Sequence, residues 1–184
     1  IMMGEMHGTN EPSEFAYGLC RLISEKEERV ILGLEISPSQ MEGFSDSMSL
    51  AELKQLNFFR GENSSGMNGE AWLHLIHNSN QHKNIITKFI DTQQFAPRDS
   101  AMYSSMLEIR KSYPNTKIVT LTGNLHNWLQ TFQNRLMLGS YLKNDTLNFD
   151  ARKIMSINHI YTEGTMLNNM GNGLELTTIE REDN

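Results

Sequence analysis

Short apolar runs alternate along this sequence with longer segments of helical pattern, and this alternation restricts the fold more than any other feature. The run "RVILGLEI" over residues 29–36 is mostly apolar and rich in β-branched residues, as expected for a strand buried on both faces. "NIITKFID" over 84–91 and "TKIVTLTG" over 116–123 have the same character. Strands of this kind between helices predict an α/β fold, with a mainly parallel or mixed central sheet flanked by helices.

Helix-start signals divide the remainder of the chain. Asn10 can cap a helix whose first turn carries acidic residues, and Ser49 with Glu52 forms a capping-box pattern. Pro114 stops a long helix, and the Gly-, Asn- and Ser-rich segment 60–69 predicts a loop that could serve as a mobile flap. The other expected elements are a strand ending over 1–3, helices over about 11–24, 50–59, 70–82, 98–113 and 135–143, and late strands within 152–164 and 174–182.

Length and composition favour one ordinary globular domain over 1–184. The chain has 184 residues, of which 38% are hydrophobic and 21% charged, with a net charge of −6. This acidity argues against a nucleic-acid surface, and no apolar run approaches the roughly 20 residues of a membrane span. The lone Cys20 excludes an internal disulfide, and its apolar helical surroundings predict a small buried side chain.

The first residues read as the end of a strand, so we expect that residues before Ile1 were removed or not included. A leader could have been among them, and both an exported and a cytoplasmic location are compatible with the sequence. The sequence leaves the oligomeric state open.

Polar side chains gather where the predicted strands end. Gly4-Glu5-Met6-His7 follows "IMM", and Gly123-Asn124-Leu125-His126 follows "IVTLT". In each turn a glycine permits a sharp bend, and a histidine three positions later can project over the sheet. Ligands of open α/β sheets bind beyond the carboxyl ends of the strands. We therefore predict that these two strand–turn–helix units, each with a G-x-x-H turn, contribute to one site.

Acidic and basic residues at other strand ends complete the candidate site. Glu35 lies near the end of an apolar strand, where a carboxylate needs a partner, in either a structural pair or a catalytic one. Glu5, Glu35 and the two histidines could form a general acid–base cluster, or a divalent metal site with Glu5, His7 and His126 as ligands. Arg98 could stabilise an oxyanion or bind a substrate carboxylate, although the Arg98-Asp99 pair could equally cap its helix and meet surface charges.

Other histidines and aromatic residues have simpler interpretations. His74 and His77 lie on one predicted helix face with Glu70, a spacing that can bind metal but is more typical of a solvated face. Trp72 and Trp128 are expected to be packing residues. Trp128 follows His126 closely enough to line a pocket beside it.

Four motifs, in order, resemble the erythromycin-esterase-like, ChaN-like and Tiki/TraB-like proteins. They are "GEMHGTNEP", "LGLEI", "PRDSAM" and "VTLTGNLHN", and the resemblance covers about residues 1–130. It implies an α/β fold in which two G-x-x-H turns and an acidic residue share a cleft. "GEMHG" is one residue shorter than the usual esterase motif, which weakens a transfer of macrolide-ester chemistry.

The resemblance also implies roles for individual residues. By motif, Glu5 and His7 match the first turn, Glu11 its trailing acid, and Glu35 the strand acid. Arg98 and Asp99 match the "RD" pair, and His126 matches the second turn. We also expect Glu11, Asp99 and Asn124 to be pocket residues of this site.

These branches differ in what they do, and they imply different functions. The erythromycin-esterase and Tiki-like branches imply a hydrolase that activates water, with or without a divalent metal, against an ester or peptide bond. The ChaN-like branch implies a binding protein for haem or another small ligand without turnover. A catalytically idle domain of a larger protein is a third possibility. The expected partner is a small-molecule or peptide substrate, not a nucleic acid.

Overall fold

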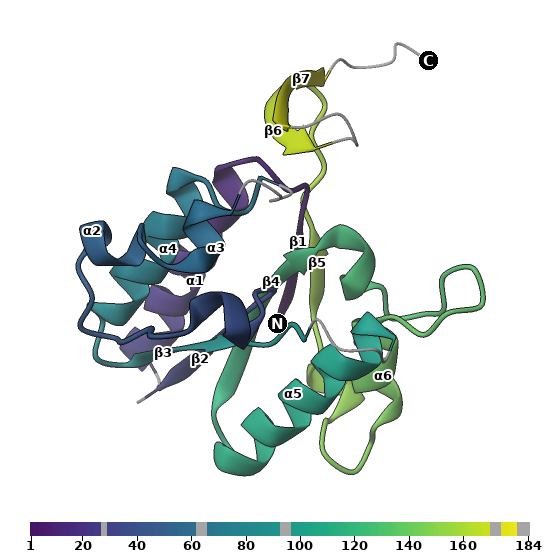
Figure 1. Cartoon of the computed structure of the whole chain (residues 1–184). Helices are drawn as coiled ribbons and strands as arrows, with labels where there is room; N and C mark the ends of the chain where they lie inside the picture. The colour runs from purple at the N-terminus through teal and green to yellow at the C-terminus, as the bar shows by residue number, and fades with distance from the viewer. Residues whose placement is uncertain (27–28, 62–65, 93–96, 170–173, 180–184) are drawn as a thin grey trace.

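A five-stranded parallel sheet forms the centre of the protein in the computed structural model (Figure 1). The structure describes residues 1–184 except 27–28, 62–65, 93–96, 170–173 and 180–184. The strand order is β3-β2-β4-β1-β5. The strands are β1 (Met2–Glu5), β2 (Val30–Leu34), β3 (Ile85–Phe89), β4 (Lys117–Gly123) and β5 (Ser156–Asn158).

Helices cover both faces of this sheet. Figure 1 shows α1 and α4 on one side and α5 and α6 on the other, so the predicted α/β class is confirmed. The longer helices are α1 (Glu11–Lys26), α4 (Glu70–Asn80), α5 (Arg98–Ser112) and α6 (Leu138–Asn144). Two short α-helices are α2 (Leu50–Leu53) and α3 (Asn57–Arg60), and the 3-10 helices are η1 (Pro38–Met41), η2 (Asn124–Asn127) and η3 (Ala151–Lys153).

Alternation along the strands builds two hydrophobic cores. Met3 and Leu32 point into the core under α1 and α4, whereas Met2 and Ile31 point into the core under α5 and α6. Successive strand residues face opposite sides of a sheet, so strands covered on both faces must be apolar throughout. This is why "VILGL" is buried at every position. Cys20 packs in the first core as a free, fully buried thiol, as the sequence predicts.

The end of the chain forms a separate antiparallel hairpin. Its strands are β6 (Gly164–Asn169) and β7 (Leu174–Ile179), which pair with each other and stand away from the central sheet (Figure 1). The late segment predicted as strand over 152–164 contains β5 and the first residue of β6, separated by irregular chain.

Two predicted elements differ from the structure in detail. The helix expected over 50–59 is divided into α2 and α3, although the capping box at Ser49 and Glu52 is present as predicted. Of the expected flap over 60–69, residues 62–65 lie outside the described residues. Within the part of the chain that the structure describes, no helix is long and apolar enough to cross a membrane.

Candidate functional site

The carboxyl ends of four parallel strands bring the predicted residues to one edge of the sheet. β1 and β4 are neighbours, with Glu5 aligned with Gly123. The helix that follows β1 covers one face, whereas the helical segments on either side of β4 belong to the other face. Adjacent strands whose connections leave toward opposite faces open a crevice beyond their carboxyl ends, which is where open α/β sheets bind ligands.

Glu35 is the centre of the polar cluster at this edge of the sheet. Its side chain is fully buried one residue past β2, and its Oε2 accepts a hydrogen bond of 2.6 Å from the backbone N–H of Gly123. Its Oε1 lies 2.6 Å from Arg98 Nη2 and 3.4 Å from His126 Nε2. A buried carboxylate is stable only when it is paired, and here a backbone amide and two side chains on separate elements supply the pairing.

His7 lies beside Gly123, close to Glu35, and is oriented by Glu5. His7 Nδ1 is 2.8 Å from Glu5 Oε1, and the Glu5 side chain is fully buried at the end of β1. Burial raises the pKa of Glu5, although its hydrogen bonds to His7 and to Trp72 act against that rise. Burial on its own would lower the pKa of His7, but the hydrogen bond to Glu5 and the charge of Glu35 raise it overall.

His126 is held between two carboxylates. Its Nδ1 lies 2.7 Å from Asp99 Oδ1, while its Nε2 faces Glu35. Asp99 is fixed in turn by the backbone N–H of Leu138, at 2.7 Å. Burial opposes protonation of His126, but the hydrogen bonds and charges of Asp99 and Glu35 prevail and raise its pKa to about 9. His126 is therefore a cation at neutral pH, with its Nδ1 donating to Asp99 and its Nε2 facing the Glu35 carboxylate.

The same cations keep Glu35 ionised. Burial by itself would raise the pKa of Glu35, but His126, Arg98 and His7 together lower it to about 2. The site therefore holds Glu35 as a carboxylate and His126 as an imidazolium across the neutral range.

Because Gly123 has no Cβ, His7 and Glu35 can approach β4 closely. A Cβ at this position would lie 3.1 Å from His7 Nε2 and 3.7 Å from Glu35 Oε2. A Cβ at Gly4 would lie 2.5 Å from both Asn124 Oδ1 and Asn158 Oδ1. Both glycines therefore give close approach, as the sequence predicts for the two G-x-x-H turns.

Two predicted pocket residues lie outside the Glu35 network. Glu11 is exposed at the first position of α1, where its Oε2 accepts a hydrogen bond from the backbone N–H of Asn10. The Asn124 amide donates to the carbonyl of His159, 3.0 Å away, so it ties η2 to the chain after β5. Asp99 does belong to the network, through His126.

Sequence reasoning missed two residues that contact this site. Asp91, just past β3, binds Arg98 through Nε and Nη2 at 2.8–3.2 Å, and so holds the guanidinium in place beside Glu35. Trp72, interpreted from the sequence as a packing residue, donates its indole N–H to Glu5 Oε2 at 3.2 Å. "FID" carried a weak signal for Asp91, since an acid there follows a strand, but the sequence held no signal for Trp72.

The predicted metal ligands are engaged with other side chains. Glu5 and His7 bond to each other, and both ring nitrogens of His126 face carboxylates. Among the described residues, no group of three or more His, Cys, Asp or Glu side chains is arranged to hold a metal ion. This arrangement does not fit a metal held by Glu5, His7 and His126.

A separate hollow of about 360 Å³ lies between α1 and α4. Asn10, Tyr17, Glu70 and His74 are among its lining residues, and none of the residues that contact Glu35 lines it. His74 Nε2 is 3.5 Å from Glu70 Oε2, and both side chains are more than half exposed, as predicted for a solvated helix face. His77 differs, because it is half-buried and its Nδ1 is enclosed.

Comparison with known proteins bears on the fold. No protein-family model matches the sequence, and no curated protein matches it. A solved structure of a mutant of the erythromycin esterase EreC, in its open conformation, is similar to this chain with a TM-score of 0.62 and 11% sequence identity. The match covers 97% of this chain and 76% of that chain. The expected erythromycin-esterase-like fold is therefore supported, and neither the ChaN-like nor the Tiki/TraB-like assignment is shown.

Proposed function

We propose that this protein is a hydrolase that activates water against a carboxylic ester. The observation that carries the proposal is the convergence of His7 and His126, from two distant turns, on the buried carboxylate of Glu35. The likeness in fold to an erythromycin esterase supports the same reaction class.

In this mechanism the two histidines have different roles. Glu5 accepts the Nδ1 proton of His7, so the lone pair of the neutral ring is on Nε2. His7 Nε2 takes a proton from water, and the resulting hydroxide attacks the carbonyl carbon of the ester. His126 is unsuited to act as this base, because both of its nitrogens already carry protons that face carboxylates.

Arg98 and His126 supply the positive charge that the transition state needs. Asp91 and Glu35 engage Nε and Nη2 of Arg98, which leaves Nη1 to donate to the oxyanion. The tetrahedral intermediate then collapses, the C–O bond to the alcohol breaks, and the proton held by His7 passes to the leaving oxygen. The products are a carboxylic acid and an alcohol, and no step requires a metal or other cofactor.

Replacing each histidine tests the proposal. On a panel of aryl and alkyl esters, His7→Ala should lower kcat by at least about 100-fold, because a general base contributes that much or more. His126→Ala should also lower kcat, through the lost positive charge. His74→Ala, at an exposed position on α4, is the matched control and should keep full activity. If His7→Ala and His126→Ala both fold and both retain wild-type rates, the proposal is wrong.

Further experiments test the predicted metal site, the predicted haem binding and peptide hydrolysis. Metal analysis of the purified protein, with assays in a chelator, tests the divalent-metal site; we propose that activity survives chelation. A haem titration followed by absorption tests the ligand carrier, for which a Soret shift at one equivalent without ester turnover would be the signature. A peptide panel run beside the esters tests amide hydrolysis.

A further inference from the structure

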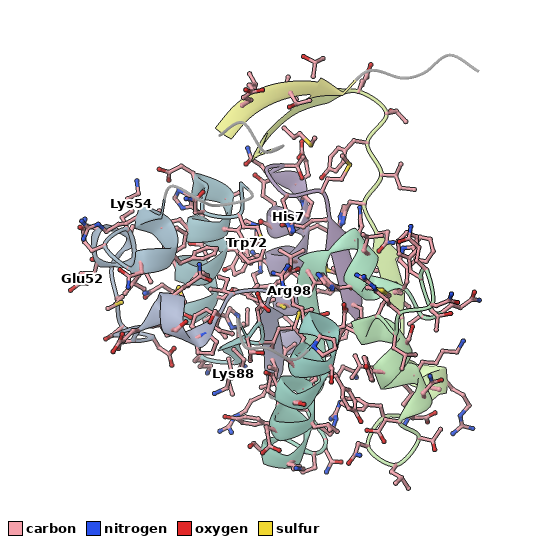
Figure 2. The ribbon with its side chains drawn as sticks, turned by 45° about the vertical axis from the view of Figure 1, so that its right-hand side comes forward. His7, Glu52, Lys54, Trp72, Lys88 and Arg98 are labelled. Carbon is pink, nitrogen blue, oxygen red and sulfur yellow. The ribbon has the colours of Figure 1, made fainter. Side chains whose placement is uncertain are left out.

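A buried indole from a distant helix contacts the acid–base pair of the site. Trp72 on α4 is only 1% exposed, and its Nε1 donates to Glu5 Oε2 at 3.2 Å. The other oxygen of the same carboxylate, Oε1, is 2.8 Å from His7 Nδ1. Figure 2 shows Trp72 and His7 near each other, with Arg98 lower in the view. The Glu5 carboxylate therefore bridges the indole and the imidazole.

The chemistry of the indole makes this bridge directional. An indole N–H can only donate, so Glu5 Oε2 must accept, and a hydrogen bond donated to a carboxyl group favours its ionised form. An ionised carboxylate carries no proton, so Glu5 can only accept a hydrogen bond from His7. This fixes the proton of neutral His7 on Nδ1 and its lone pair on Nε2.

From this geometry we infer that Trp72 is a positioning residue, which holds Glu5 as an acceptor and thereby sets the tautomer and orientation of His7. The inference rests on the proposed function, because the tautomer matters for catalysis only if His7 Nε2 is the base. Trp72 itself touches neither water nor substrate in this scheme, and it acts through Glu5.

A packing role alone would not account for this placement. Trp72 contacts Phe58 with ring centroids 6.2 Å apart, and both side chains belong to the core under α1 and α4. Phe58 shares that packing but does not contact Glu5 through any polar atom. Phe58→Leu is therefore a matched control for loss of core packing, while Trp72→Phe removes the N–H and keeps an aromatic ring.

The primary experiment is NMR of the protein with ¹⁵N-labelled imidazole rings, compared among the wild type, Trp72→Phe and Phe58→Leu. We expect the wild type and Phe58→Leu to show neutral His7 protonated at Nδ1. We expect Trp72→Phe to show a mixture of the two tautomers. In the ester assay, Trp72→Phe should lower kcat about tenfold with KM unchanged, because Glu5 loses a hydrogen bond that orients His7. Phe58→Leu should keep the wild-type kcat.

A second measurement does not depend on folding of Trp72→Phe. The chain has two tryptophans, and Trp128 is 41% exposed, so its indole N–H resonance is an internal reference. Glu5→Gln should move the Trp72 indole resonance upfield, because a charged acceptor is lost, and should leave that of Trp128 unchanged.

The outcomes separate this inference from the proposed function. The inference is wrong if His7 has the same tautomer in Trp72→Phe as in the wild type, or if Glu5→Gln leaves the chemical shift of the Trp72 indole N–H unchanged. This holds whether or not the protein hydrolyses esters. If the tautomer changes as expected but no ester is cleaved, the positioning role stands and the hydrolase proposal fails.

Discussion

Adding a single methyl group at Gly123 tests the geometry of the site most directly. Gly123 has φ −58° and ψ 147°, a conformation that alanine adopts freely, so Gly123→Ala introduces no backbone strain. The new Cβ would lie 3.1 Å from His7 Nε2 and 3.3 Å from His7 Cε1. These distances are a few tenths of an ångström below ordinary van der Waals contact, so His7 must move or its bond to Glu5 must lengthen.

Two opposing contributions determine the expected change in stability. Overpacking at a buried position costs about 1–3 kcal/mol, and replacing glycine by alanine at a permitted conformation returns about 0.4–1 kcal/mol through the unfolded chain. We therefore expect Gly123→Ala to lower the free energy of unfolding by about 1 kcal/mol. Because His7, the base in the proposed mechanism, would be displaced, we also expect kcat to fall about 10- to 100-fold.

Urea unfolding followed by circular dichroism measures the first quantity, and ester turnover measures the second. Gly18→Ala is the matched control, since Gly18 lies in α1 and a Cβ there would meet nothing within 4 Å. This control should stabilise the protein by up to about 1 kcal/mol and leave kcat unchanged. If Gly123→Ala behaved like Gly18→Ala in both assays, the close packing of His7 against β4 would be refuted.

Two further predictions concern charge. The pKa of His126 rises from its usual 6.5 to about 9 on folding, so its stabilising contribution is complete below pH 6.5 and is lost as the pH rises through 9. The pKa of Glu35 falls from 4.5 to about 2 on folding. Its stabilising contribution is therefore complete above pH 4.5 and is lost as the pH falls through 2. The free energy of unfolding in urea should therefore be highest from about pH 4.5 to 6.5, and His126→Asn should reduce its fall at alkaline pH. An equally steep fall in that variant would contradict the raised pKa of His126. Asp91→Asn should lower the free energy of unfolding by about 1–2 kcal/mol and reduce kcat several-fold, because Arg98 loses a charged partner and some of its orientation. The control Glu108→Gln breaks an exposed pair with Lys111 and should change stability by less than about 0.5 kcal/mol, and equal losses in both variants would show that Asp91 has no special role.

Much of the architecture could be predicted from local pattern. Continuous apolar strands have to be covered on both faces, so "VILGL" and "KIVTLTG" by themselves imply a sheet between two helical layers. In a parallel sheet the carboxyl ends of the strands share an edge, so the G-x-x-H turns at Gly4 and Gly123 could be assigned to one crevice. Capping at Ser49 and Glu52 was equally visible, because a capping box depends on neighbouring residues only.

The partners of these residues could not be predicted in the same way. The Trp72–Glu5 bond joins positions 67 residues apart, and the bond from Gly123 to Glu35 joins positions 88 apart. Pairings over such separations depend on how α4 packs on the sheet and on strand order, which no local spacing encodes. For the same reason, Glu11 and Asn124 shared the motifs but lie outside the network.

The sequence by itself determined the layers of this protein and the edge of the sheet where polar chemistry gathers, since periodicity and glycine placement act over a few residues. Only the tertiary structure decided which histidine lies between two carboxylates and which one is hydrogen-bonded to a single carboxylate. That difference depends on the carboxylates packed around each ring, and Glu35 beyond β2 and Asp99 on α5 reach His126 only when the chain is folded.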